Sequence, residues 1–257
     1  MDFSTETGRT ETGRTETGGT ESGRTEPGTT DVGSTSVGGT DTGSTDTGAA
    51  SRPGPAPAVE GDFTTRLTVR ADRPEPAARL AAWAGAQGLD LTTGVRDRGR
   101  TPSRPVLTLR GTGSLDAQRH AAELWSGRLA EAGFPVIRTA IAAAPWNAGV
   151  PGTDAEAAVL PAHCHFAHRV TLRLRIPYDT QRLAAVVEGH AARVSRTARR
   201  VLSGGVQERY VTQRAFGSGR PSARARLDAL LDALAAAGFP AADVEEEFVL
   251  LDDNPGA

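Results

Sequence analysis

The sequence predicts an α+β fold made of two tandem copies of one β-α-β-β-α-β unit behind a disordered N-terminal tail. Strand-like alternation and helical periodicity follow one another in the same order in each half of residues 61–257. Two motifs also recur at nearly the same offset: RLTVR at 66–70 returns as RVTLR at 169–173, and LAEAGFP at 129–135 returns as LAAAGFP at 234–240. The first 60 residues show neither pattern.

The first copy is expected over residues 61–144. Residues 63–70 alternate between apolar and polar side chains, as a strand with one buried face does. Leu115, Ala122 and Leu129 form an apolar stripe at helical spacing, and Gly133 suits the end of that helix. The expected elements are strands over 63–70, 89–95, 105–110 and 136–143, and helices over 74–87 and 114–132.

The second copy is expected over residues 163–257, after a linker at 145–162 rich in Ala, Gly and Pro. The turn at 203–205, Ser-Gly-Gly, favours a hairpin. The expected elements are strands over 168–176, 192–202, 206–216 and 244–251, and helices over 179–189 and 221–237. This order predicts the ferredoxin-like arrangement in both copies. In architecture alone, the tandem layout resembles small-molecule-sensing regulatory modules, and architecture does not decide function.

Residues 1–60 are expected to be a disordered tail and linker. Glycine recurs at every fifth position from Gly8 to Gly48, within pentads rich in Thr and acidic residues. Such a segment has too little apolar surface to offset the entropy of ordering it. It carries ten acidic residues and four arginines, a net −6, and the remaining 21 acidic residues and 25 arginines give the body a net +4.

Several function classes are excluded by composition. All 29 residues in the Lys and Arg count are arginine, so a lysine Schiff base or phosphate-loop lysine is excluded. Cys164 is the single cysteine, which excludes an internal disulfide. There is no apolar run of about 18 residues, so no membrane helix is expected. The first residues lack the pattern of a secretory signal, and we therefore expect a cytoplasmic protein.

One face of the sheet is the most informative candidate surface. Helices should cover the side with Val170, Leu172, Leu174 and Ile176, and alternation then directs Arg and Thr side chains to the opposite, open face. A second basic cluster is expected on the hairpin after residue 190, and Arg209 belongs to this cluster. The predicted ligand-binding residues are Arg169, Arg173, Arg175, Arg193, Arg196, Arg199, Tyr210, Thr212 and Arg214.

Three interpretations of this Thr/Arg face remain open. The arginines are ordinary solvated strand residues, partly neutralised by Glu245 and Glu247 on the neighbouring strand. Alternatively, the faces pack against each other or join two copies of the chain as a homodimer. Finally, the face is a basic platform for a phosphate-containing small molecule or an acidic protein. RNA binding by base stacking is not expected, because Tyr210 is essentially the one aromatic residue assigned to this face.

Residues 163–168 gather three histidines and the cysteine. His163, His165 and His168 are metal-ligand candidates, yet in a strand His163 and His165 share one side while His168 lies on the other. We therefore favour no metal site and expect no cofactor. A catalytic Cys164 is not favoured either, because adjacent strand residues point apart.

The sequence thus predicts a binding or regulatory protein rather than an enzyme, with an anionic ligand or acidic partner held on the Thr/Arg-rich face. One alternative is an enzyme that acts on a phosphorylated or nucleotide substrate, using an arginine clamp and a histidine as acid and base. Another is a homo-oligomeric interaction protein that binds no ligand. No residue pattern selects the ligand.

Overall fold

The computed structural model describes residues 58–70, 74–92, 104–195, 198 and 200–255. These residues lie within one compact unit, Ser51–Ala257. The tail expected over residues 1–60 lies outside the described residues up to position 57, as do Arg196 and Arg199.

In the part of the first half that the structure describes, four strands and two helices follow one another in the expected order. They are β1 (Glu60–Val69), α1 (Pro74–Ala86), β2 (Asp90–Thr92), β3 (Val106–Ser114), α2 (Leu115–Glu131) and β4 (Val136–Ala143). Helix α2 begins at Leu115 because the Ser114 hydroxyl accepts a hydrogen bond from the Ala117 N–H, which is an N-cap. Gly133 follows the helix with φ 82°, a left-handed backbone that suits glycine and ends the helix.

The second half repeats this order, with one strand divided in two. Its elements are β5 (His165–Arg175), α4 (Thr180–Gly189), β6 (Ala192–Val194), β7 (Arg200–Leu202), β8 (Val206–Phe216), α5 (Arg220–Ala236) and β9 (Ala241–Asp252). A short helix, α3 (Asp154–Ala158), lies between the halves. Thr153 and Glu156 form a capping box at its start.

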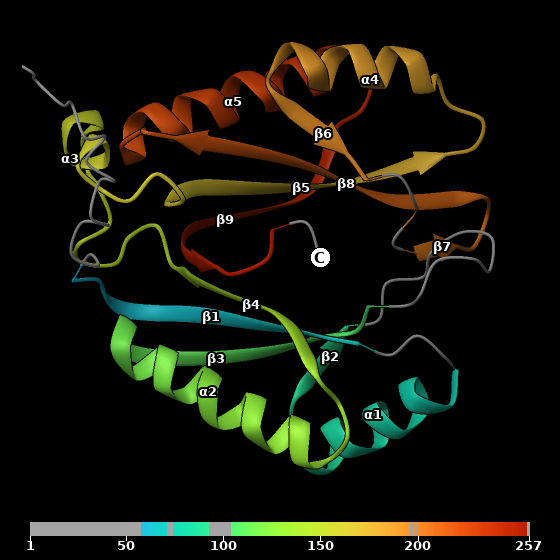
Figure 1. Ribbon diagram of the computed structural model, residues 1–257. Coiled ribbons are helices and arrows are strands. Elements are labelled where there is room, and N and C mark those ends of the chain that lie inside the picture. The colour runs from blue at the N-terminus through green and yellow to red at the C-terminus, as the bar shows by residue number, and fades with distance from the viewer. Residues whose placement is uncertain (1–57, 71–73, 93–103, 196–197, 199, 256–257) are drawn as a thin grey trace, which may run out of the picture. The chain divides into compact units, whose positions relative to one another are not determined.

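The nine strands of the described residues belong to one sheet, and every strand pairing in it is antiparallel. The strand order is β2-β3-β1-β4-β9-β5-β8-β6, with β7 also paired to β8. The order is β4-β1-β3-β2 in the first half and β9-β5-β8-β6 in the second. In both, the last strand of the half lies beside its first strand, which is the ferredoxin-like order. The halves join where β4 pairs with β9 (Figure 1). The expected class, helices packed on an antiparallel sheet, is confirmed.

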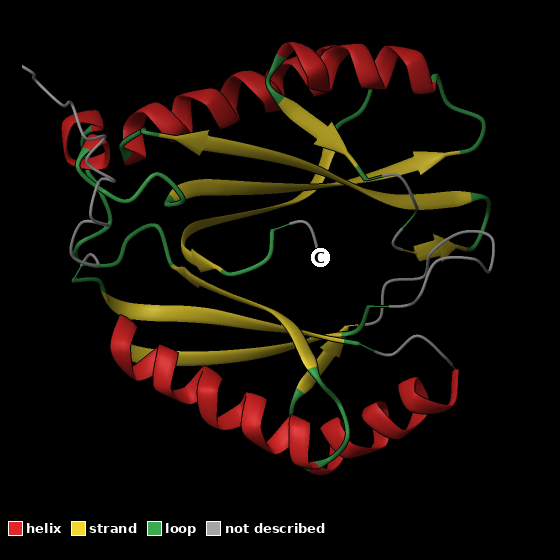
Figure 2. Ribbon diagram, in the orientation of Figure 1, coloured by secondary structure: helices red, strands yellow, loops and turns green. Residues whose placement is uncertain are grey.

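Helices of both halves cover the same face of this continuous sheet. Phe63 on β1 lies opposite Ala143 on β4. Ala143 lies opposite Phe248 on β9, which lies opposite Phe166 on β5. Residues directly opposite in neighbouring strands share a face, and all four are buried in one apolar core that extends across the junction. Figure 2 shows the helices on the outer side of the strands in each half.

A second apolar core fills the space between α4, α5 and the strands of the second half. Val170, Leu172 and Val211 are completely buried there, and Leu227 and Leu230 of α5 pack with them. These strand residues alternate with the arginines and threonines of the opposite side. The alternation expected from the sequence is therefore confirmed for β5 and β8, and the face without helices is the open face.

Two local expectations were wrong. The strand expected over 192–202 is two short strands, β6 and β7, both paired to β8. Ile176 was expected to point to the helices, but β5 ends at Arg175 and the Ile176 side chain is 48% exposed. Apart from these two, residues 145–162, expected as a linker, contain α3, whose Asp154 accepts a hydrogen bond from the Gly219 N–H at the start of α5. This contact ties the linker to the second half.

Candidate functional site: the outer edge of strand β8

The open face of the second half carries the expected side chains. The register of β5 and β8 places Arg169 opposite Thr212 and Thr171 opposite Tyr210, on the side away from the helices. Arg173 and Arg175 are exposed, whereas Thr212 and Tyr210 are partly buried. The Arg169 guanidinium also lies over the Tyr210 ring, 5.3 Å from its centre.

Carboxylates compensate many of these arginines. Arg169 forms an ion pair of 2.9 Å with Glu245 of β9, and Arg173 lies 3.3 Å from Glu208. Glu247 pairs not with an arginine of its own half but with Arg66 of β1, at 2.7 Å. The open face is therefore a lattice of both charges over much of its area, as the first interpretation of the sequence anticipated, and not a uniformly basic platform.

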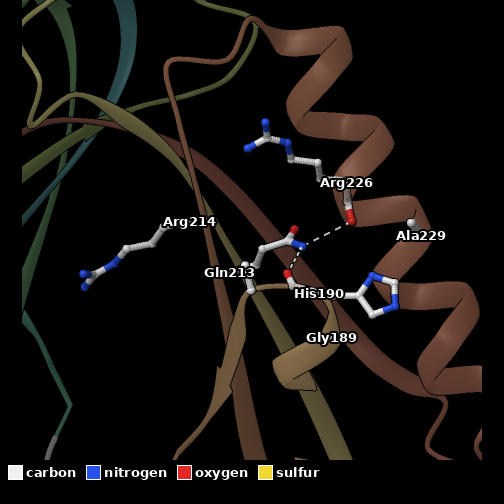
Figure 3. A pocket seen from close by; sticks show the side chains of 7 residues that line it. Gly189, His190, Gln213, Arg214, Arg226 and Ala229 are labelled. Atoms are coloured by element: carbon white, nitrogen blue, oxygen red, sulfur yellow. Dashed lines mark hydrogen bonds between the residues drawn. The ribbon is translucent and has the colours of Figure 1, made fainter. Parts of the chain in front are cut away.

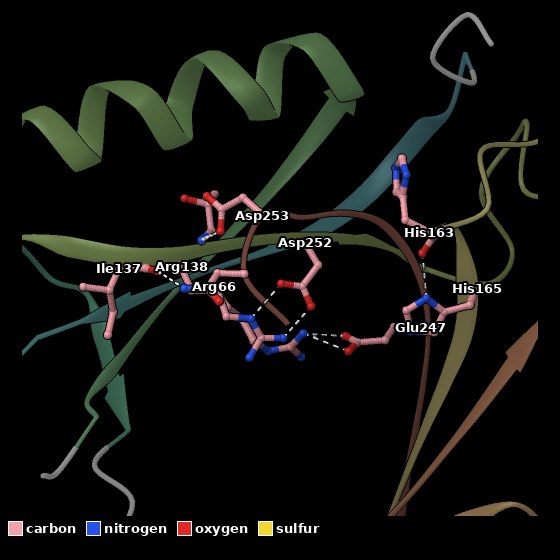
Figure 4. A network of polar contacts seen from close by, with 10 residues as sticks. Arg66, Ile137, Arg138, His163, His165, Glu247, Asp252 and Asp253 are labelled. Carbon is pink, nitrogen blue, oxygen red and sulfur yellow. Dashed lines mark hydrogen bonds and ion pairs between the residues drawn. The ribbon is translucent and has the colours of Figure 1, made fainter. Parts of the chain in front are cut away.

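The junction between the halves holds the most strongly paired of these charges (Figure 4). Both oxygens of the Asp252 carboxylate accept hydrogen bonds from Arg138 of β4, at 2.7 and 2.6 Å. Burial acts to raise the pKa of Asp252, but the hydrogen bonds and charge of Arg138 outweigh it and hold the pKa below its ordinary value. Asp253 accepts a hydrogen bond from the Thr139 N–H. These contacts fasten the end of β9 to β4.

The three histidines expected as metal-ligand candidates have separate partners. An Nε2 contact of 3.0 Å joins His163 to the Leu250 carbonyl, and an Nδ1 contact of 2.8 Å joins His165 to the His163 carbonyl. His168 is buried on the helix-covered face and contacts Gln213. No group of three His, Cys, Asp or Glu side chains is arranged as a metal site within the described residues. Cys164 is buried, and desolvation raises its thiol pKa to about 11.

A pocket of about 270 Å³ lies at the outer edge of β8, between the α4–β6 loop and α5 (Figure 3). We call it the edge pocket. It is lined by Gly189, His190, Ala191, Gln213, Arg214, Arg226 and Ala229. Among the described residues that line it, His190, Arg214 and Arg226 carry or can gain positive charge and none is acidic, and the Arg214 side chain points away from His190 toward the open face (Figure 3). A second pocket, of about 440 Å³ on α2, includes Glu123 and Glu131 in its lining and so suits an anion less well.

Gln213 fixes the floor of the edge pocket. Its side-chain amide donates to the backbone carbonyls of His190, at 3.0 Å, and Arg226, at 3.2 Å. Its Oε1 lies 2.9 Å from Nδ1 of His168. Because an amide oxygen can only accept, Nδ1 is the donor and carries the proton. Figure 3 shows Gln213 between the α4–β6 loop and α5, joined to both. One buried side chain thus holds two walls of the pocket to the sheet.

The backbone of β8 is paired along the edge that borders the pocket. The Ser195 N–H donates to the Tyr210 carbonyl, so Tyr210 directs its backbone groups to the outer edge of β8. Successive residues alternate in an antiparallel ladder, and Arg214 therefore directs its N–H the same way. Ala192 of β6 pairs with Gln213 across this edge, so the ladder holds the α4–β6 loop beside Arg214.

The predicted binding residues are only partly brought together. Arg193 is exposed on β6 opposite Thr212, so it lies near Arg214 on the open face. Arg209, expected in the same cationic region, lies instead on the helix-covered side, where it donates to the Tyr178 hydroxyl and the Ser195 carbonyl. Arg196 and Arg199 lie outside the described residues.

Sequence reasoning missed two kinds of residue in this region. Gln213 and Arg226 were not singled out, because their roles depend on the packing of α5 beside β8. Phe216 was also missed as an open-face residue, although its two-residue spacing from Arg214 was a sufficient signal. Its side chain is 50% exposed.

The sequence matches no protein-family model and no curated protein. Three solved structures are similar over most of their own length. The small subunit of acetolactate synthase from Thermotoga maritima shows 14% identity over 74% of this chain and 95% of that chain, with a TM-score of 0.29. The regulatory subunit of aspartate kinase from Thermus flavus shows 16% identity over 68% and 94%, with a TM-score of 0.30.

The regulatory subunit of aspartate kinase from Thermus thermophilus, in its ligand-free form, shows 17% identity over 67% of this chain and 93% of that chain, with a TM-score of 0.28. TM-scores of this size support no argument about shared function. Within the described residues, no helix combines the length and apolar character that crossing a membrane requires.

Proposed function

We propose that this protein is a binding protein with a regulatory role, and that it holds a small anionic ligand in the edge pocket. The observation that carries the proposal is the lining of that pocket: His190, Arg214 and Arg226 come from three different elements, and no carboxylate accompanies them. Arginine donates in a fixed fork that suits phosphate and carboxylate groups.

The local electrostatics support the edge pocket over the rest of the open face. Arg169 and Arg173 already have carboxylate partners, so an anion would have to compete with Glu245 and Glu208 for them. Arg214 and Arg226 are exposed, and neither forms an ion pair with a described residue. Arg214 interacts with the charge of Asp252, and Arg226 with that of Asp154, but an anion there would displace no ion pair of either arginine.

Binding is a better account of the edge pocket than catalysis. Its lining contains one histidine, no carboxylate and no nucleophilic hydroxyl or thiol side chain. General acid–base chemistry usually needs a second polar group to orient or complement the histidine. We also propose that the two halves are tandem copies, spanning residues 61–144 and 163–257, because the same strand order occurs in each.

Isothermal titration of the full chain with pyrophosphate and citrate tests the proposed binding. A hydrogen bond to a charged group contributes roughly 1.5–3 kcal/mol, so losing one guanidinium should weaken binding by about 10- to 150-fold. We expect such losses for Arg214→Ala and Arg226→Ala. Arg110→Ala is the matched control, since Arg110 is an exposed arginine on the open face of the first half.

Unchanged affinity in both pocket variants would place any bound anion elsewhere. Absence of binding by the natural sequence to every anion tested would overturn the proposal itself. Thermal unfolding of each variant without ligand serves as the folding control, because a ligand that binds only the native state raises the melting temperature by mass action.

A further inference from the structure

Phe216 places an exposed aromatic ring near Arg214, on the open face at the end of β8. It is the last residue of β8, and alternation along the strand puts its side chain on the same face as that of Arg214. The two positions are separated by about 7 Å, the spacing of residues i and i+2 in a strand. A single exposed apolar side chain is ordinary on a protein surface. The surroundings of Phe216 distinguish it.

His165 holds the Phe216 ring from one side. The ring centroids lie 4.4 Å apart with an interplanar angle of 29°, so the two rings are stacked. His165 is only 7% exposed, and its Nδ1 contact with the His163 carbonyl fixes the orientation of its ring. Half of the Phe216 surface nevertheless remains open to solvent. A supported ring with an open surface is a preorganised stacking platform.

The electrostatics keep this platform uncharged. Burial lowers the pKa of His165 below its ordinary value, and the nearby positive charge of Arg214 lowers it further, whereas the His163 carbonyl contact, Glu247 and Asp252 act to raise it. The lowered pKa favours the neutral imidazole, which stacks on Phe216 as an aromatic ring. Positive charge is supplied next to the platform by the exposed Arg214.

We propose that the anion bound at the edge of β8 carries a flat aromatic ring, which stacks on Phe216 while Arg214 holds the negative group. The ligand class is a small aromatic anion, such as a nucleoside phosphate or an aromatic carboxylate. This inference deepens the proposed function and rests on it. Offset stacking between rings and the pairing of arginine with phosphate or carboxylate supply the two parts of the recognition.

Pairs of ligands that are matched in charge but differ in the ring test the inference. Isothermal titration of the full chain compares phenyl phosphate with methyl phosphate, and adenosine monophosphate with ribose 5-phosphate. Base–aromatic stacking corresponds to about a 5- to 150-fold gain in affinity. We expect the natural sequence to prefer the ring-bearing member of each pair by a factor in this range.

Two substitutions at one position separate stacking from simple apolar contact. Phe216→Leu keeps an apolar side chain without a flat ring, and we expect it to abolish the preference while leaving affinity for methyl phosphate unchanged. Phe216→Tyr keeps the ring and should keep the preference. Because Phe216 is half exposed, both variants should retain the melting temperature of the natural sequence within a few degrees.

The outcomes separate the two proposals. Equal affinity for both members of each pair would overturn the aromatic inference and leave anion binding intact. Equal weakening of both ligands by Phe216→Leu would also overturn it. No binding of any of the four ligands or of pyrophosphate would overturn both proposals. Binding of a single-stranded oligonucleotide without binding of a mononucleotide would overturn the small-ligand class in favour of nucleic acid.

Discussion

Breaking the ion pair between Arg138 and Asp252 should loosen the junction of the two halves. The pair is bidentate, with contacts of 2.7 and 2.6 Å, and the side chains are 26% and 10% exposed. Opposite charges about 4 Å apart attract by about 4 kcal/mol at an effective dielectric constant of 20. Partial desolvation of both groups offsets part of this gain. We therefore expect a coupling energy of about 1–3 kcal/mol at pH 7.

A double-mutant cycle measures this coupling directly. Arg138→Leu, Asp252→Asn and the double variant are unfolded with urea, and the non-additive part of their free energies of unfolding is the coupling. The control cycle uses Arg119 and Asp116 of α2, a pair of 3.1 Å in which the Asp116 side chain is 89% exposed. An exposed helical pair of this spacing should couple by at most about 0.5 kcal/mol.

The pH dependence of the cycle has a defined sign. Folding lowers the pKa of Asp252, so its contribution to stability is fully present above the unfolded value of about 4 and is lost as the pH falls through the folded value. The coupling should thus be constant from pH 7 to about pH 5 and decline below that. A coupling no larger than that of the control pair, or one that grows on acidification, would refute this account of the junction.

Two further predictions concern buried groups. Gln213→Leu removes hydrogen bonds to His168 and to two backbone carbonyls and should lower the free energy of unfolding by about 2–4 kcal/mol, whereas the exposed Gln181→Leu should change it by less than about 0.5 kcal/mol. Equal urea midpoints for the two variants would contradict the bridging role. A pKa of about 11 leaves about one Cys164 in a thousand as thiolate at pH 8, so a disulfide reagent should label the native protein at least 100-fold more slowly than the protein unfolded in urea. Similar rates would show that the thiol is accessible.

Much of the fold follows from local patterns. The strands at 136–143 and 206–216 have the expected bounds, because alternating side chains or turn residues mark both ends. Helices α2, α4 and α5 begin and end within one residue of expectation, since caps and following glycines are local signals. The inward positions of Leu67, Val170 and Val211 could be predicted equally well, because side-chain direction in a strand has a fixed period of two.

The candidate site was harder to predict from the sequence than the fold. Arg214 was predicted as a binding residue, but the sequence placed it with Arg209, which lies on the other side of the sheet. Arg66 was assigned to the open face without a partner, and it pairs with Glu247 from the other half. Which carboxylate neutralises which arginine depends on strand order and register over more than 180 residues of sequence, and no local pattern encodes that.

The sequence by itself determined the element types, the buried face of each strand and the cationic character of β5 and β8, because these depend on side-chain period and composition. Only the tertiary structure decided that β4 pairs with β9, that the acidic residues of β9 neutralise the centre of the open face, and that Arg214, Arg226 and His190 line one pocket at the edge of β8. Those outcomes arise from contacts between residues far apart in the chain, whose free energies depend on register, burial and distance.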